Sequence, residues 1–201
     1  MIRLYLAFVF ARIEIMDYLN KSLRILLATN GLILLAGAML GPIYALFVEE
    51  IGGNIIDAGL AGGIFALTAG ITTIIAGRYS DKIKESELII VFGYLLLGIG
   101  FFLYTKVNSI QTLFLVQVII GLGEAIYTPV FDQVYTKHME EKIIGRAWGL
   151  WEGMNYFVVA GGAVIGGFIV HKFGFYTLFY VMTVISILTA LYILFLPRKV
   201  L

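Results

Sequence analysis

Two acidic residues, Glu124 and Glu152, stand inside long apolar stretches of the sequence. An ionisable side chain in a membrane interior costs roughly 2.5–3.5 kcal/mol on insertion scales, so each is a candidate for function. Burial disfavours the charged form of a carboxyl group, so a carboxyl in a poorly solvated cavity could exchange protons near neutral pH. The same group could neutralise a cationic solute, and competition between the two uses would give proton/cation exchange. The alternative for both acids is structural pairing, with Arg146 as the partner of Glu152.

Polar residues around these acids share helical faces. One set, spaced by three or four positions, would form a single stripe of a helix: Gln117, Gly121, Glu124, Thr128 and Asp132. Such a stripe on a membrane helix should face protein or a water-filled cavity. Three further sets also share faces: Asn30, Gly37, Gly41 and Tyr44; Glu152, Asn155 and Tyr156; and Thr68 with Thr72. Two alternatives stay open, namely that the glycines only allow close helix packing and that the threonines bond their own backbone.

The composition indicates a membrane protein. Of 201 residues, 61% are apolar and 13% are charged, against roughly 45–50% and about 25% in soluble domains. These values exclude an ordinary cytosolic enzyme and a disordered chain, and the net charge of +1 gives no reason to expect a nucleic-acid partner. Without cysteine, and with two distant histidines, the sequence offers no disulfide framework and no metal-ligand cluster. We also find no nucleophile–base pair and no phosphate loop, so we expect neither an enzyme nor a cofactor.

Six apolar stretches each reach the roughly 17–25 residues that a membrane helix needs. They cover residues 23–48, 58–76, 88–104, 110–135, 146–170 and 174–196, and form one transmembrane domain over 23–201. With the N-terminus inside, only Lys106 and Lys172 of the 14 Lys and Arg residues fall outside, which predicts that both termini are cytoplasmic. Residues 1–22 are too charged to span, and we expect an interfacial amphipathic helix there, with a signal peptide as the alternative.

The segment after the second span resembles the cytoplasmic loop motif of the major facilitator superfamily. It reads Gly77-Arg78-Tyr79-Ser80-Asp81-Lys82 and matches that motif at Gly77, Ser80, Asp81 and Lys82. Tyr79 replaces the usual leucine and Lys84 replaces a glycine. The resemblance is strengthened by position, because the family carries this motif in the inner loop after its second helix.

Asp81 acquires a conformational role through that resemblance. The family pattern implies that this carboxylate lies against the positive N-terminal end of a helix in an opposite half of the transporter. In a second copy of this chain, the matching helix start is Gly145–Ala147, which includes Arg146. Such a contact would bias one of two states of a rocking protein. Capping of the third span by Asp81 is the alternative.

Two further motifs are similar to those of the same family. In span five the resemblance to an antiporter motif rests on Gly149, Gly162, Ala163, Gly166 and Gly167, and plain packing through the pairs Gly149/Gly153 and Gly162/Gly166 is the alternative. In span four, Leu113, Gln117, Ile120, Gly121 and Gly123 resemble a motif in which many relatives carry an arginine tied to proton transfer. Gln117 occupies the position of that arginine, so the usual proton-handling scheme does not carry over directly.

These resemblances identify the chain as a half-size member of the family, similar to the N-terminal half of a twelve-helix transporter. They imply an all-α half bundle of six transmembrane helices built as a 3+3 inverted repeat, with the first and fourth helices lining the cavity. The expected substrate and proton cavity comprises Glu124, Glu152, Gln117, Asn30, Tyr44, Thr128, Asn155 and Tyr156.

The implied activity needs a second half. Alone, the chain would turn its polar stripes toward lipid, so we expect a homodimer that works by rocking alternating access. We expect proton-coupled export of small organic or cationic solutes, as in multidrug efflux, across a prokaryotic-type plasma membrane. The alternatives are a non-transporting membrane scaffold, or one half of a heteromeric or truncated transporter.

Overall fold

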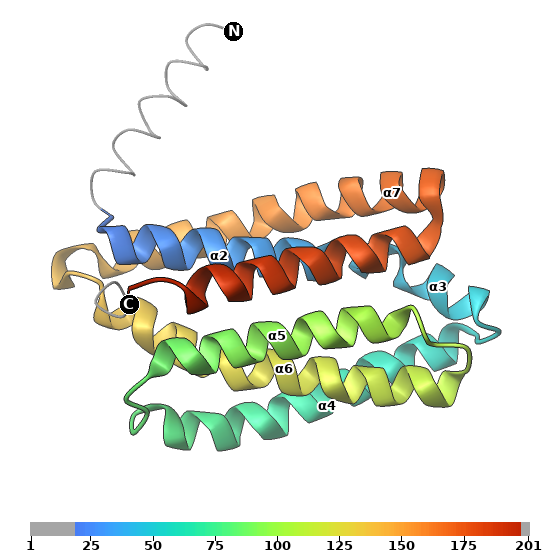
Figure 1. The fold of residues 1–201 in the computed structure, drawn as a ribbon, viewed down its shortest axis with the longest axis horizontal. Coiled ribbons are helices and arrows are strands. Elements are labelled where there is room, and N and C mark those ends of the chain that lie inside the picture. The colour runs from blue at the N-terminus through green and yellow to red at the C-terminus, as the bar shows by residue number, and fades with distance from the viewer. Residues whose placement is uncertain (1–18, 198–201) are drawn as a thin grey trace, which may run out of the picture.

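The computed structural model describes residues 19–197, which form helices joined by short turns and loops, with no strand in this range (Figure 1). The helices are α2 (Lys21–Ala38), α3 (Tyr44–Glu50), α4 (Ile55–Ser80), α5 (Ser86–Tyr104), α6 (Ile110–Lys137) and α7 (Ile144–Leu194). Short 3-10 turns, Gly41–Ile43 and Glu141–Ile143, precede α3 and α7. The interfacial helix expected over residues 1–22 lies outside the described residues except for its last positions, where α2 begins.

Three predicted spans depart from a pattern of one separate helix for each span. The span over residues 23–48 is broken between α2 and α3 at the turn that contains Pro42, because proline has no backbone N–H to continue a helix. The spans over 146–170 and 174–196 join in α7, which is two helices meeting at Gly174, where φ is 79° and ψ is 171°. Only glycine adopts this conformation readily, and the chain reverses there, so that the two segments of α7 run back along each other (Figure 1).

Five continuous stretches of the described chain are long and apolar enough to cross a membrane. They are Lys21–Glu50, Ile55–Ser80, Ser86–Tyr104, Ile110–Lys137 and Glu141–Leu194. The last has 54 residues, more than twice the roughly 20 that one crossing requires, and contains the reversal at Gly174.

The long helices lie side by side and meet at two ends of the bundle (Figure 1). At one end α3 stops, α5 gives way to α6, and α7 reverses; we call this the Gly174 end. At the other, the Asp81 end, α4 stops and α2 and α7 begin. There the side-chain amide of Asn20 caps α2 by accepting from Leu23 N (2.9 Å) and donates to the carbonyl of His138 at the end of α6 (2.8 Å).

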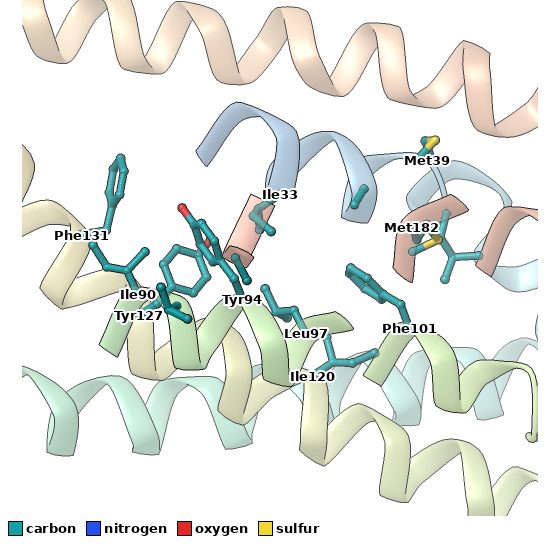
Figure 2. Packing of buried hydrophobic residues seen from close by; sticks show 14 of the residues in the cluster. Ile33, Met39, Ile90, Tyr94, Leu97, Phe101, Ile120, Tyr127, Phe131 and Met182 are labelled. Carbon is teal, nitrogen blue, oxygen red and sulfur yellow. The ribbon is translucent and has the colours of Figure 1, made fainter. Parts of the chain in front are cut away.

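Helix packing is closest where glycine removes a side chain. The main partners are α4 with α6, α5 with α6, α5 with α7, and α2 with α7. A Cβ on Gly93 of α5 would lie 2.6 Å from the Tyr127 Cβ of α6, and one on Gly121 of α6 would lie 2.9 Å from the Phe65 carbonyl of α4. Around these approaches, Tyr94 and Tyr127 pack edge to face at 4.8 Å in the buried core (Figure 2).

The N-terminus of α4 is held by a capping box that gives a testable stability effect. Asn54 Oδ1 accepts from the backbone N–H of Ile56 (2.8 Å) and of Asp57 (3.3 Å), and the Asp57 carboxylate accepts from Asn54 N (2.8 Å). Replacing Asn54 by Ala should cost about 1 kcal/mol, because the first helical donors lose their acceptor. Hydrogen exchange should show faster opening of residues 55–57 in the variant, whereas exchange unchanged from the wild type would contradict a capping role.

Candidate functional site

A cavity of about 430 Å³ opens between α2, α4, α5, α6 and α7. Its lining is chiefly apolar and aromatic, and Glu124 is the only carboxylate among the described residues that line it. Gly37 and Gly41 line it from the α2 side, and a Cβ on either would meet nothing within 4 Å in the described chain. Within the described residues these two glycines therefore leave room for the cavity and do not form a close helix contact. Leu97, Phe101, Ile120 and Tyr127 project into the same region from α5 and α6 (Figure 2).

The polar end of this cavity is formed by two residues from different predicted stripes. Gln117 of α6 is 5% exposed, and its Nε2 donates a hydrogen bond to the Tyr44 hydroxyl at the start of α3. The bond joins the broken first span to the fourth. The pair places an amide and a hydroxyl group at this end of the cavity, and groups of this kind can hydrogen-bond a solute.

Glu124 lies on the exposed side of α6, close to a point where the continuous helix lacks one backbone hydrogen bond. Thr128 Oγ1 donates to the backbone carbonyl of Glu124 (2.7 Å), not to its side chain. Pro129 follows within the helix, so the carbonyl of Ala125 lacks the N–H that a regular helix would supply. Within residues 19–197 no hydrogen bond or ion pair to the Glu124 carboxylate is present. The carboxylate is therefore available to a proton or a cation.

The second predicted acid lies apart from the cavity lining. Glu152 is exposed on α7, with Asn155 half-buried and Tyr156 exposed on the following turn. The carboxylates of Glu152 and Asp132 lie near enough to repel each other. Side chains of α6 and α7 also meet nearby, where the ring centroids of Phe131 and Trp151 are 6.5 Å apart. The structure thus brings together two acids that the sequence places on separate helices.

Two other groups of predicted residues serve the helix packing. Asn30 is 1% exposed and accepts a hydrogen bond from the Tyr94 hydroxyl (3.3 Å), so it lies in the core between α2 and α5, outside the cavity lining. Thr68 and Thr72 are half-buried on α4, and Thr68 packs beside Gly121 of α6.

The motif segment forms the end of α4. Asp81 is the C-terminal capping position of that helix, and its Oδ1 accepts a hydrogen bond from Gln133 Nε2 of α6 (3.0 Å). It does not cap α5, because the capping position there is Glu85 and makes no side-chain capping bond. Ser80 Oγ bonds back to the Gly77 carbonyl (2.9 Å), and three basic residues of the motif region are exposed at this end: Arg78, Lys82 and Arg146.

The glycines of span five divide into two groups. A Cβ on Gly162 would lie 2.8 Å from Ala38 Cβ, and one on Gly166 would overlap the Met39 carbonyl oxygen, so both allow α7 to approach α2. A Cβ on Gly149, Gly153 or Gly167 would meet nothing within 4 Å in the described chain. These three glycines have no packing role within the residues that the structure describes.

Several residues of the site were not predicted. Gln133, the partner of Asp81, lies next to the polar stripe and shows no signal of its own in the sequence. The aromatic cavity residues Phe65, Phe101, Tyr104 and Tyr127 lie among many apolar neighbours, so no pattern separates them from lipid-facing or core residues. Asp132 belongs to the predicted polar stripe of α6. Its spacing from Glu124 was the one feature of the sequence that could have indicated its position near Glu152.

The sequence matches the family described as Major Facilitator Superfamily over residues 26–200. It is similar to two uncharacterized MFS-type transporters of Methanocaldococcus jannaschii, MJ1560 (25% identical, covering 88% of this chain and 45% of the relative) and MJ1317 (24%, 90% and 46%). It is also similar to the multidrug resistance protein MdtG of Salmonella schwarzengrund (24%, 83% and 42%). The chain thus spans under half the length of these relatives.

The chain belongs to the major facilitator superfamily, as the family match and the all-helical fold show. It is a multi-pass integral membrane protein of a family of transporters, not an enzyme. The resemblance stated from the sequence motifs is confirmed.

Proposed function

We propose that this protein is a secondary active transporter that exchanges protons for small organic or cationic solutes. The observation that carries the proposal is the cavity of about 430 Å³, in which one carboxylate, Glu124, stands among apolar and aromatic residues. An apolar cavity suits the hydrocarbon part of an amphipathic solute, and a few polar groups fix its orientation. A proton and a cationic group compete for the same carboxylate, so solute loading displaces the proton.

The similarity to MdtG supports a solute of this kind. That relative is a multidrug resistance protein, and aromatic residues such as Phe65, Phe101 and Tyr127 give this cavity surfaces for a flat or lipophilic cation. We propose that the direction is export, across the plasma membrane of a prokaryotic cell.

We propose that the unit crosses the membrane six times, with the two segments of α7 counted separately, and that the Asp81 end is cytoplasmic. The basic residues gather at that end, as the positive-inside rule requires. Gly174 supports the sixth crossing, since it reverses the chain between two segments that are each long enough to span. The pairing of α2 with α7 and of α6 with α4 through glycine contacts fits a 3+3 inverted repeat.

We propose that two such units form the working transporter and that a second copy of this chain is the partner. Only Ala61 and Ser80 of α4 are buried. Five glycines of α4 would accept a Cβ without meeting any atom within 4 Å in the described chain: Gly59, Gly62, Gly63, Gly70 and Gly77. Small residues let helices approach closely in lipid, and an exposed Glu152 on α7 is costly unless a partner or water covers it.

The transport proposal is tested by flux into proteoliposomes under an imposed pH gradient, over a panel of cations, sugars and anions. We expect gradient-dependent movement of organic cations only. Absence of flux for every solute, with protein correctly inserted, would favour the scaffold instead.

The homodimer is tested by disulfide crosslinking. Because the sequence contains no cysteine, introduced cysteines are the only thiols that can react. A chain carrying Ala66→Cys on α4 and Ala160→Cys on α7 should crosslink between copies, because both exposed positions lie mid-helix on the proposed contact faces. Ile99→Cys on the exposed side of α5 is the matched control and should not. Native mass should be about twice 22.3 kDa, whereas a transport-active monomer, or a complex with a different chain, would contradict the proposal.

A further inference from the structure

A second cavity, of about 310 Å³, lies at the Gly174 end of the bundle. It forms where α3 ends, the loop between α5 and α6 passes, and α7 reverses. Its lining includes Glu50, Asn108 and Tyr176 around a floor of Phe47, Tyr104 and Phe175. Tyr104 also lines the Glu124 cavity, so this residue contributes to both linings. The predicted transport site includes none of the residues of this second cavity.

The aromatic floor is rigid because its rings pack on one another. Phe47 lies 5.4 Å from Phe175 and 5.6 Å from Tyr104, measured between ring centroids. Both Phe47 and Tyr104 are under 5% exposed, whereas Tyr176 is 59% exposed at the rim. These buried rings therefore give the cavity a fixed floor, and the Tyr176 phenol is the ring that stays accessible at its opening.

The charge of this cavity is negative. Glu50 carries an exposed carboxylate at its edge, and neither Lys nor Arg is among the described residues that line it. The two lysines at this end of the bundle point at other rings. Lys106 Nζ lies 5.8 Å from the Phe102 ring, and Lys172 Nζ lies 5.5 Å from the Phe173 ring. Neither ammonium group neutralises Glu50.

We propose that this cavity is a binding site for a small organic ammonium group, separate from the Glu124 cavity. The exposed Tyr176 ring at the rim attracts a positive charge through its electron-rich face, as the aromatic rings that bind quaternary ammonium groups do. The Glu50 carboxylate supplies the opposite charge, and the Asn108 carboxamide supplies an acceptor. The volume, at the lower end of the roughly 300–1,000 Å³ of ligand sites, suits a group of choline size.

The test is a ligand-observed NMR titration of the full chain in dodecyl maltoside, with choline as the probe. Its uncharged carbon isostere, 3,3-dimethylbutan-1-ol, separates charge recognition from simple apolar filling. Glu50→Gln should raise the Kd for choline by roughly 5- to 30-fold, and Tyr176→Ala should raise it by about threefold or more. Glu49→Gln is the matched control, since Glu49 is the exposed neighbouring acid and does not line the cavity.

Three results support the proposal together. Choline binds the wild type, the isostere binds at least about tenfold more weakly, and Glu50→Gln weakens choline binding whereas Glu49→Gln does not. The proposal is overturned if the isostere binds equally well, if choline does not bind, or if Glu124→Gln abolishes binding while Glu50→Gln preserves it. The last result would assign choline to the transport cavity and would leave the proposed function intact.

The ammonium group could be free in solution or carried by a lipid headgroup, and a second arm distinguishes these sources. Dihexanoylphosphatidylcholine below its micellar concentration presents the same ammonium on a phospholipid. If this phospholipid binds more tightly than choline and Glu50→Gln abolishes that binding, the ligand is a lipid headgroup. Binding of choline alone identifies a free solute. If Glu50→Gln changes the affinity for neither probe, the proposed site is wrong.

Discussion

Replacing Glu124 by Gln is expected to abolish proton-coupled transport while leaving a folded protein. The side chain of Gln has nearly the same size but cannot release a proton or carry a negative charge. Because the Glu124 carboxylate makes no hydrogen bond or ion pair within the described chain, its loss removes no structural contact. Flux driven by a pH gradient should fall to the level of protein-free liposomes, and the thermal midpoint of unfolding should stay close to that of the wild type.

The control for this experiment is Glu140→Gln, which neutralises an exposed acid between α6 and α7, outside the cavity lining. It should transport as the wild type does. Full coupled transport by Glu124→Gln would refute the assignment of the coupling carboxylate. Loss of transport in Glu152→Gln alone would move that role to the acid pair of Asp132 and Glu152.

Replacing Gly166 by Ala is expected to destabilise the protein by about 3 kcal/mol or more, because the added methyl group must displace the α2 backbone. A Cβ there would overlap the Met39 carbonyl oxygen and lie 2.8 Å from Met39 Cα. Backbone cannot rotate away as a side chain can, so α2 and α7 must separate. Reversible unfolding in mixed dodecyl maltoside and SDS micelles measures the difference in free energy of unfolding.

The adjacent Gly167→Ala variant is the matched control. A Cβ at Gly167 meets nothing within 4 Å in the described chain, and alanine favours the helix over glycine by up to about 1 kcal/mol. It should therefore be neutral or slightly stabilising. Equal stability of the two variants would show that α2 and α7 do not pack as closely as the structure has them.

The sequence predicted the helical class and the position of each apolar stretch, because the hydrocarbon thickness imposes a length that composition reveals. It did not predict the break at Pro42 or that one residue, Gly174, would be the whole turn between two segments. Both features depend on backbone conformation at a single position. Periodicity cannot report such a local change, because it averages over several turns.

The spacing of polar residues also predicted which residues share a helix face better than it predicted which residues contact each other. The stripe of α6 was a useful guide, since Gln117 and Glu124 both line the cavity. Asn30 and Tyr44 share a predicted face, yet Asn30 bonds Tyr94 in the core while Tyr44 bonds Gln117. The helix break after Ala38 changes the rotation between the two positions. The pairing of Asp81 with Gln133 could not be predicted from the sequence for a different reason. This contact depends on how the ends of α4 and α6 meet.

The central claim is that a proton and an organic cation compete for one carboxylate, and proton release on binding tests it most directly. Tetraphenylphosphonium is added to the purified protein in weakly buffered detergent containing a pH indicator dye, at a pH where Glu124 is protonated. We expect the wild type to release protons as the cation binds and Glu124→Gln to release none. Binding without proton release, or the same release from Glu124→Gln, would contradict the account.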